Sequence, residues 1–430
     1  MKTKHLLPAL KALLVLTAYL PFLAATTGGP FGPAPDTSNR VDDFALDLLR
    51  SEAAVSNRAP ANGLFSPFSI YSCMAMGYVA SSGSTRYGLA RALYFPADND
   101  LLLRDLPALR RKIADEGNKP GVELRMAEAV WLDSTYAKWR PDYLRTLDRL
   151  GAQPPRDAKF ADKTAACAEI NRWISDTTHG RITSGITPAD LPSRSNGNFI
   201  DEPALVAVDA VWFKAQWMHR FDAAETKQHS FNTPGGSVNA PMMHQNSLFL
   251  YAADPHWQLL VMPCVGGRFS MLALLPRDVE DAKTMTASLT PGTVPGLLTH
   301  AHPATVDILF PKFTLRNHAD LEAPLTALGA GDAFNRRGGN FDGMIIQQPN
   351  AAHIYLSSLK HDTWLQVSEE GAEAAAATTA TYFSVGCAAR PEAEREEFHA
   401  DRPFLFFIVH NPSRAVLFAG WVTDPSAGGL

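Results

Sequence analysis

The segment from Val367 to Gly386 constrains the fold more than any other, because its sequence suits both a loop and a buried strand. Two acids and a glycine precede a run of very small side chains. Residues two apart share one face of a strand. One face would therefore carry only small side chains, namely Ala372, Ala374, Ala376, Thr378 and Ala380. A strand of this kind can enter a packed sheet without a steric clash.

The same segment also permits an alanine-rich helix. Ala374 to Ala377 are strong helix formers, and the acids Glu369, Glu370 and Glu373 suit the positive end of a helix dipole. Composition alone does not separate this helix from the strand. The charged tract from Cys387 to Glu397 that follows is typical of an exposed loop.

Three motifs near the C-terminus together resemble the serpin family of protease inhibitors. The hinge motif of that family is similar to Glu369, Glu370, Gly371, Ala372, Glu373, Ala374, Ala375, Ala376, Ala377 and Thr378. Residues 398–412 and 415–425 are similar to the strand pair that follows its reactive loop. The resemblance extends from about Ser38 to Pro425. It implies an α+β serpin fold, with three β-sheets, about nine helices and an exposed reactive-centre loop at about residues 371–400.

The rest of the chain is consistent with one domain over residues 38–425 and a short tail at 426–430. Helical periodicity dominates the first part, including Ser84–Leu93 and Ala166–Thr178, and strands dominate from Leu205 onward. Helices first and strands later indicate an α+β domain. The contents of 46% hydrophobic and 19% charged residues are typical of a globular chain.

The N-terminus predicts secretion. Lys2 and Lys4 precede an apolar run from Leu13 to Ala24, so residues 1–25 are typical of a signal peptide. Residues 26–37 are rich in glycine and proline and indicate a flexible leader. We expect an extracellular protein, or a periplasmic one in a Gram-negative bacterium, with no membrane attachment after cleavage.

Composition argues against several other classes of function. The net charge of −5 does not favour nucleic acid as a partner. The four cysteines at 73, 167, 264 and 387 and the scattered histidines lack metal-ligand spacing, so we expect no metal and no cofactor. The basic cluster of Arg104, Arg110, Arg111 and Lys112 is expected to be solvated charge. No hydrolase or phosphate-loop motif occurs, although a secreted hydrolase remains a distant alternative.

The resemblance assigns two groups of residues that control the main sheet. At its upper end, Lys312 would form an ion pair with Glu369, beside Trp217; the alternative is a solvated lysine. At its centre lie four polar residues, Ser66, Ser69, Asp209 and His361. Asp209 replaces the usual asparagine, so we expect a charge-assisted hydrogen bond to His361. The alternative is a core histidine with no switching role.

Family spacing, counted from Glu369, places the cleaved bond between Val385 and Gly386. Tyr382, Phe383 and Ser384 precede it, and Cys387 follows, either as a reactive thiol or as an incidental one. A valine at this point suits elastase-like or subtilisin-like proteases. One alternative is a neighbouring bond between Tyr382 and Cys387. The other is Arg390, which would suit a trypsin-like enzyme.

These residues predict a secreted, monomeric suicide inhibitor of serine proteases, with cysteine proteases as a further class. In the family, the protease attacks the loop and becomes trapped as a covalent complex when the cleaved loop enters the main sheet. The inhibitor has no turnover of its own. The alternative is a non-inhibitory member that acts as a carrier, storage protein or chaperone.

Overall fold

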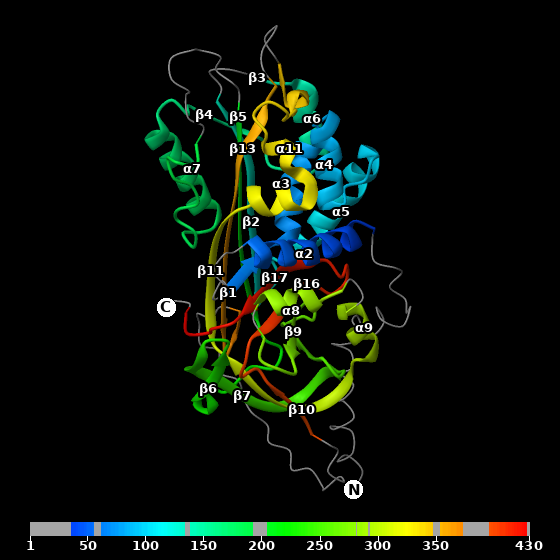
Figure 1. Ribbon diagram of the computed structural model, residues 1–430, viewed down its shortest axis with the longest axis vertical. Helices are drawn as coiled ribbons and strands as arrows, with labels where there is room; N and C mark the ends of the chain where they lie inside the picture. Colours follow the sequence, from blue (N-terminus) through cyan, green and yellow to red (C-terminus); the bar gives the residue numbers. More distant parts are fainter. Residues whose placement is uncertain are drawn as a thin grey trace.

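A computed structural model describes residues 36–55, 62–133, 138–191, 204–280, 282–290, 293–346, 353–372 and 395–427. Long strands run along the molecule, most helices gather toward one end, and the strands of a second sheet fill the other end (Figure 1). The α+β class predicted from the sequence is confirmed.

The helices lie mainly in the first part of the chain, as predicted. Within the described residues they are α2 (Asp36–Val55), α3 (Pro67–Tyr78), α4 (Gly83–Leu93), α5 (Asn99–Glu116), α6 (Pro141–Arg149), α7 (Lys163–Thr177), α8 (Ala282–Ser288), α9 (Thr293–His300), α10 (Glu322–Leu325) and α11 (Gly331–Phe334). Helix α2 begins at Asp36, two residues before the predicted domain start, so the leader does not extend to residue 37.

Six strands form the sheet that we call the long sheet. Its order is β11 (Phe313–Asp320), β13 (Tyr355–Ser368), β14 (Gly371–Ala372), β5 (Ala204–Gln216), β2 (Val122–Asp133) and β4 (Arg156–Ala158). The apolar run from Leu205 to Phe213 predicted a strand covered on both faces, and every residue in it is buried.

The remaining described strands form two further sheets. The larger follows the order β1 (Asn62–Phe65), β17 (Val416–Val422), β16 (Phe404–His410), β9 (Phe269–Pro276), β8 (Trp257–Pro263), β7 (Gly236–Ala253), β10 (His302–Pro311) and β15 (Glu396–His399), with β6 (Lys227–Thr233) beside β7. The smaller pairs β12 (Ile345–Ile346) with β3 (Lys138–Trp139).

The boundaries predicted for the exposed loop, about 371–400, are too wide. Gly371 and Ala372 already pair with two strands of the long sheet. At the other end, β15 pairs with β10, and Phe398 is fully buried. The buried ring of Phe398 therefore fixes the chain in the larger sheet before residue 400, the end of the loop expected from the sequence.

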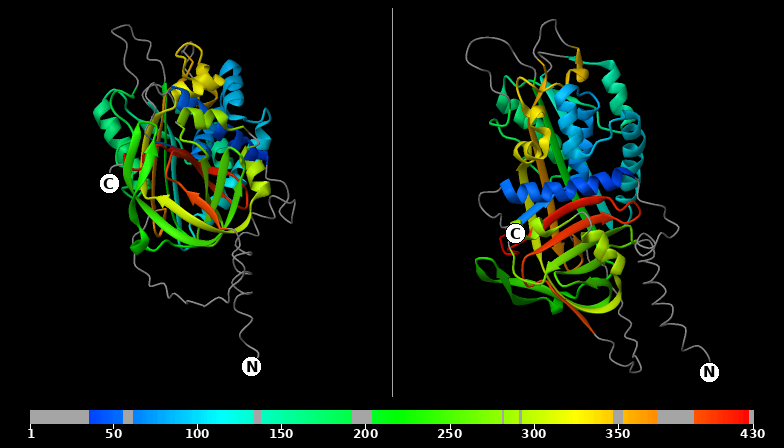
Figure 2. Two further views of the ribbon diagram at one scale, coloured as in Figure 1. Left: turned by 60° about the horizontal axis from the view of Figure 1, so that its bottom comes forward. Right: turned by 45° about the vertical axis from the view of Figure 1, so that its right-hand side comes forward.

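The two faces of the long sheet are covered differently. Helix α7 covers one face, which we call the front face, while α2 to α5 lie on the opposite side, the core face (Figures 1 and 2). A second hydrophobic cluster joins α7 to β2, β4 and β5, through residues that include Ile170, Ile174, Val208 and Trp212. From β13, only Trp364 belongs to this cluster. Helix α7 is thus attached to one half of the sheet.

Candidate functional site

The centre of the long sheet contains a seam, which we define as the parallel pairing of β5 and β13. Nine register pairs make up this seam, from Tyr355 opposite Ala204 to Trp364 opposite Trp212. Beyond Trp364 the two strands separate, and β14 lies between them, antiparallel to both. The chain after β13 has therefore already begun to enter the sheet at one end of the seam.

Gly371 is the residue that makes this entry possible. Its φ of +154° lies in a region that L side chains rarely adopt, and an added Cβ would lie 2.0 Å from the carbonyl oxygen of Ala215. Any other residue would push the start of β14 away from β5. The predicted hinge glycine is thus required by backbone geometry.

The ion pair proposed at this end of the sheet is present as a contact. The Lys312 Nζ atom lies 2.9 Å from the Glu369 carboxylate, and Thr226 Oγ1 donates a hydrogen bond of 2.8 Å to the same carboxylate. Trp217 Nε1 donates to the carbonyl of Ser368 at 2.9 Å. The backbone amide of Trp217 also donates to the Glu370 carbonyl, at 2.8 Å. The hinge is therefore held by Trp217, directly after β5, and by Lys312 and Thr226, which belong to other parts of the fold.

Glu369 stays ionised in this setting. Burial would raise the pKa of its carboxyl group, but the hydrogen bonds from its own backbone, Lys312 and Thr226 outweigh burial and lower the pKa. The Glu369 carboxylate is thus charged, and can pair with Lys312, at every pH above the ordinary pKa of a glutamate.

The four polar residues predicted at the centre of the sheet also lie together, on the core face of the seam. Asp209 and His361 are direct register partners on β5 and β13, and both are fully buried. The His361 Nε2 atom accepts a hydrogen bond of 2.9 Å from the backbone amide of Ser66. His361 Nδ1 therefore carries the proton and donates it to Asp209 Oδ2, at 2.8 Å. The side chains join the two strands of the seam and the start of α3.

Ser66 and Ser69 complete this group at the N-terminus of α3. Ser66 caps the helix, because its Oγ atom accepts a hydrogen bond of 3.3 Å from the amide of Ser69. The Ser69 hydroxyl donates to Asp209, so the helix and β5 are linked directly.

Sequence reasoning missed two further members of this network. Ser69 Oγ also lies 3.4 Å from Glu128 of β2, whose carboxylate pairs with Arg110 of α5. The expectation that Arg110 is solvated charge is therefore wrong, since its side chain is only 14% exposed. The signal available in the sequence was Glu128 itself, a single acid within the apolar run from Met126 to Leu132.

Much of the predicted reactive loop lies outside the described residues. This applies to Glu373, Ala374, Ala375, Ala376, Ala377, Thr378, Tyr382, Phe383, Ser384, Val385, Gly386, Cys387 and Arg390. The described cysteines, Cys73, Cys167 and Cys264, are free and buried. Burial raises the pKa of each of their thiols, so they are poor nucleophiles.

The described part of the chain holds neither a candidate metal site nor a candidate membrane-spanning helix. It contains no group of three or more histidine, cysteine, aspartate or glutamate side chains that could hold a metal ion. No helix in this part is both long enough and apolar enough to cross a membrane.

Comparison with known proteins agrees with the arrangement of the sheet and hinge. The family model described as serpin (serine protease inhibitor) matches residues 39–425. The chain therefore belongs to the serpin family, as its hinge and C-terminal motifs predicted.

Relatives and a solved structure extend this result. A leukocyte elastase inhibitor of Equus caballus is 32% identical over 403 residues, covering 89% of this chain and 97% of the relative. An uncharacterized serpin-like protein of Thermococcus kodakarensis is 31% identical over 394 residues, covering 91% and 86%. The thermophilic serpin tengpin, in its native state, superposes with a TM-score of 0.77 at 22% identity, covering 90% of this chain and 94% of that one. The predicted serpin fold is confirmed.

Proposed function

We propose that this chain is a secreted suicide inhibitor of serine proteases, which traps its target by inserting the cleaved loop into the seam. The protease serine attacks the carbonyl of Val385, an ester forms, and the bond to the nitrogen of Gly386 breaks, so that Gly386 acquires a free amine. The freed arm then enters between β5 and β13 and carries the attached protease along before water can hydrolyse the ester.

The observation that carries this proposal is β14, which is antiparallel to both strands of a pair that is otherwise parallel. Extension of β14 along the seam replaces one parallel contact by two antiparallel ones, which are slightly more stable per residue. About 12 inserted residues would form on the order of 10 hydrogen bonds, each with a net value of about 1 kcal/mol. Roughly 10 kcal/mol is then available to displace the protease.

The register of β14 also supports the hinge residues that the sequence singled out. Ala372 lies opposite Val367 and Ala215, which both belong to the main core. Residues directly opposite each other in a sheet point to the same face, so even-numbered residues of the arm would face the core as β14 extends. These are the small residues Ala374, Ala376, Thr378 and Ala380.

The length of the seam supports Val385 as the residue before the cleaved bond. In the register of β14, each step forward in the arm pairs with one step back along β13. Continued without a slip, this register places Ser384 opposite Tyr355, the last residue of β13 in the seam. Val385 would then lie at the far end of the sheet. Cleavage after Arg390 would make the inserted arm five residues longer than this.

Proteases with a small apolar pocket are the targets that we propose. Val385 would fill such a pocket, as in elastase-like and subtilisin-like enzymes. The relatives named leukocyte elastase inhibitor point to the same class. Incubation with elastase-, subtilisin-, chymotrypsin- and trypsin-like proteases tests this directly. We expect a one-to-one covalent complex that survives denaturant, and mass spectrometry should find a released peptide that begins at Gly386. Cleavage without a complex would instead support a non-inhibitory serpin.

A matched pair of hinge variants tests insertion itself. Ala372→Arg places a long charged side chain on the core face, so we expect cleavage to continue and trapping to stop. Ala375→Arg introduces the same side chain on the opposite face and should retain most of the trapping. If Ala372→Arg traps the protease as well as Ala375→Arg does, the insertion mechanism is overturned.

Secretion is a separate part of the proposal and rests on residues 1–25. The measurement is the N-terminal sequence of the mature protein from its native host, which we expect to begin near Thr26. A mature chain that retains Lys2 and Lys4 would overturn it.

A further inference from the structure

The front face of the seam is fastened by contacts that differ from those of its core face. Helix α7 packs on β2, β4 and β5, and the segment that follows it, residues 180–191, continues over the same face. Ile182, Ile186 and Leu191 of this segment are buried in the cluster that contains β5. The segment is therefore part of the β5 half of the sheet, and any contact that it makes with β13 crosses the seam.

Arg181 makes the first crossing contact. The centre of its guanidinium group lies 5.6 Å from the ring centroid of Trp212 on β5 and 5.5 Å from that of Trp364 on β13. These tryptophans are register partners and form the last closed pair of the seam before β14. One exposed cation thus spans both strands at the point where they would first separate.

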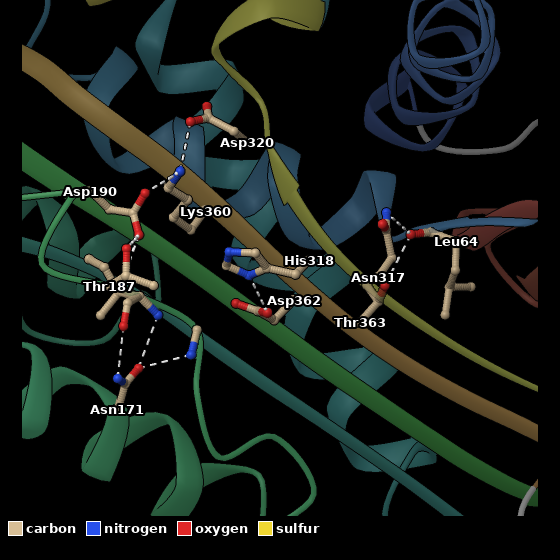
Figure 3. Close-up of polar contacts among 12 residues, drawn as sticks. Leu64, Asn171, Thr187, Asp190, Asn317, His318, Asp320, Lys360, Asp362 and Thr363 are labelled. Carbon is tan, nitrogen blue, oxygen red and sulfur yellow. Dashed lines mark hydrogen bonds and ion pairs between the residues drawn. The ribbon is translucent and has the colours of Figure 1, made fainter. Parts of the chain in front are cut away.

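Asp190 makes the second crossing contact, to Lys360 of β13. The Lys360 Nζ atom lies 2.7 Å from Asp190 Oδ1 (Figure 3). This pair is largely buried, with side-chain exposures of 7% for Lys360 and 15% for Asp190. Asp190 is held in place by Thr187, whose backbone amide and hydroxyl both donate to its Oδ2 atom.

The segment that carries Asp190 is in turn anchored to α7. Asn171 of α7 accepts hydrogen bonds from the amides of Gly185 and Ile186 and donates to the Ile186 carbonyl (Figure 3). Lys163 at the start of α7 donates to the Leu191 carbonyl at 2.8 Å. Asp190 is thus fixed to the β5 half and cannot follow β13 freely when the sheet opens.

Lys360 has a second partner that provides an internal comparison. Its Nζ atom also lies 2.7 Å from Asp320 Oδ2, on β11 (Figure 3). Strand β11 pairs with β13 along eight register positions and lies on the same side of the seam. A strand that enters the seam moves β13 away from β5 by about 4.8 Å, the spacing of neighbouring strands. This movement breaks the contact with Asp190 and leaves the contact with Asp320 intact.

We propose that Arg181 and the Asp190–Lys360 pair form a clasp across the front of the seam, and that release of this clasp limits the rate at which a strand enters the sheet. The clasp contacts exist in the closed sheet and are lost on opening, so their removal lowers the barrier to insertion. This inference rests on the proposed function, because it supposes that the seam opens to admit a strand.

A synthetic peptide with the sequence of residues 371–385 tests the clasp without a protease. Labelled peptide is incubated with the intact protein, and its stable incorporation is followed over time by native gel or fluorescence anisotropy. We expect Asp190→Asn to raise the rate about tenfold, the factor that corresponds to 1.4 kcal/mol. Arg181→Gln should raise it about threefold, because an exposed cation–π contact is weaker than a buried ion pair.

Asp320→Asn is the matched control, since it removes the partner of Lys360 that does not cross the seam. It should leave the rate within about twofold of that of the native protein. Arg172→Gln and Asp176→Asn, at exposed positions on α7, are further controls. Neither should change the rate of peptide incorporation. A double variant of Asp190→Asn and Lys360→Met should be no faster than the quicker single variant, because both remove the same contact.

The outcomes separate the clasp from the proposed function. Equal rates for Asp190→Asn, Asp320→Asn and the native protein would overturn the clasp and leave trapping by insertion intact. If no variant incorporates the peptide and the native protein forms no covalent protease complex, the proposed function fails and the clasp falls with it. Thermal unfolding of each variant verifies that a changed rate comes from a folded protein.

Discussion

The two faces of one seam are closed by different chemistry. On the core face, Asp209 and His361 are fully buried and joined to Ser66 and Ser69 of α3. On the front face, Arg181 and Asp190 reach β13 from an irregular segment, and Arg181 is exposed. The core contacts fix three elements in one arrangement, whereas the front contacts restrain only the movement of β13 relative to β5.

This difference predicts a division between stability and rate. A buried polar group that loses its partner pays the full cost of desolvation, so changes on the core face should act mainly on the free energy of unfolding. On the front face Arg181 is exposed, and Lys360 keeps its partner Asp320 when Asp190 is lost, so a change there should cost less in stability. These contacts nevertheless lie directly on the path of an entering strand. Changes on the front face should therefore act mainly on the rate of insertion.

The largest effect is expected for Asp209→Ala. This change leaves His361 Nδ1 without its acceptor in a fully buried site, and leaves the Ser69 hydroxyl only its longer contact of 3.4 Å with Glu128. The loss should cost about 3 kcal/mol in the free energy of unfolding. Asp209→Asn retains an acceptor for His361 and should recover most of the loss. Urea denaturation measures both. A loss below about 1 kcal/mol for Asp209→Ala would show that the core face does not carry the stability.

Arg110→Met tests how far the core network extends from the seam. Arg110 pairs with Glu128, which is buried and lies beside Ser69. Burial already raises the pKa of Glu128, and loss of the arginine would raise it further. The variant should lose about 2 kcal/mol at neutral pH, and acidification should reduce the difference from the native protein because Glu128 then becomes neutral. The control variant Arg111→Met changes an exposed neighbour and should have the same free energy of unfolding as the native protein.

Lys312→Met tests the end of the seam where β14 begins. The lysine is 38% exposed, so the stability lost should be only about 1 kcal/mol. The lowered pKa of Glu369 means that this contribution is present above the ordinary glutamate pKa and is lost as pH falls through the lowered value. Urea denaturation over a series of falling pH values should therefore show a difference from the native protein at pH 7 that shrinks as the pH falls. A difference that does not change with pH would assign the effect to packing.

The core face of the seam could be predicted from the sequence and the front face could not, for a physical reason. The resemblance to the serpin family assigns Ser66, Ser69, Asp209 and His361, which lie on regular elements whose register and helix cap bring these side chains together. Arg181 and Asp190 lie in a segment without periodicity, so no spacing rule relates them to Trp364 or Lys360. The start of the hinge also lies on a regular element: the register of β14 pairs Ala372 with Val367 and Ala215, which both belong to the main core.

The smallest effect is expected at His318, which borders the clasp on β11. Its Nδ1 atom lies 2.8 Å from Asp362 Oδ1, and this hydrogen bond raises the pKa of the histidine. Stability from the pair is therefore full below the ordinary histidine pKa of about 6.5 and is lost as pH rises through the raised value. Because His318 is half exposed, the contribution should be about 0.5 kcal/mol.

His318→Gln should remove this pH dependence between pH 6 and pH 9, measured by urea denaturation, while the exposed His256→Gln should not. Both His318 and Asp362 lie on the β11–β13 side of the seam, so the rate of peptide incorporation should stay the same in His318→Gln at every pH. A change in that rate would show that a contact which does not cross the seam also resists its opening. The clasp would then not be confined to Arg181, Asp190 and Lys360.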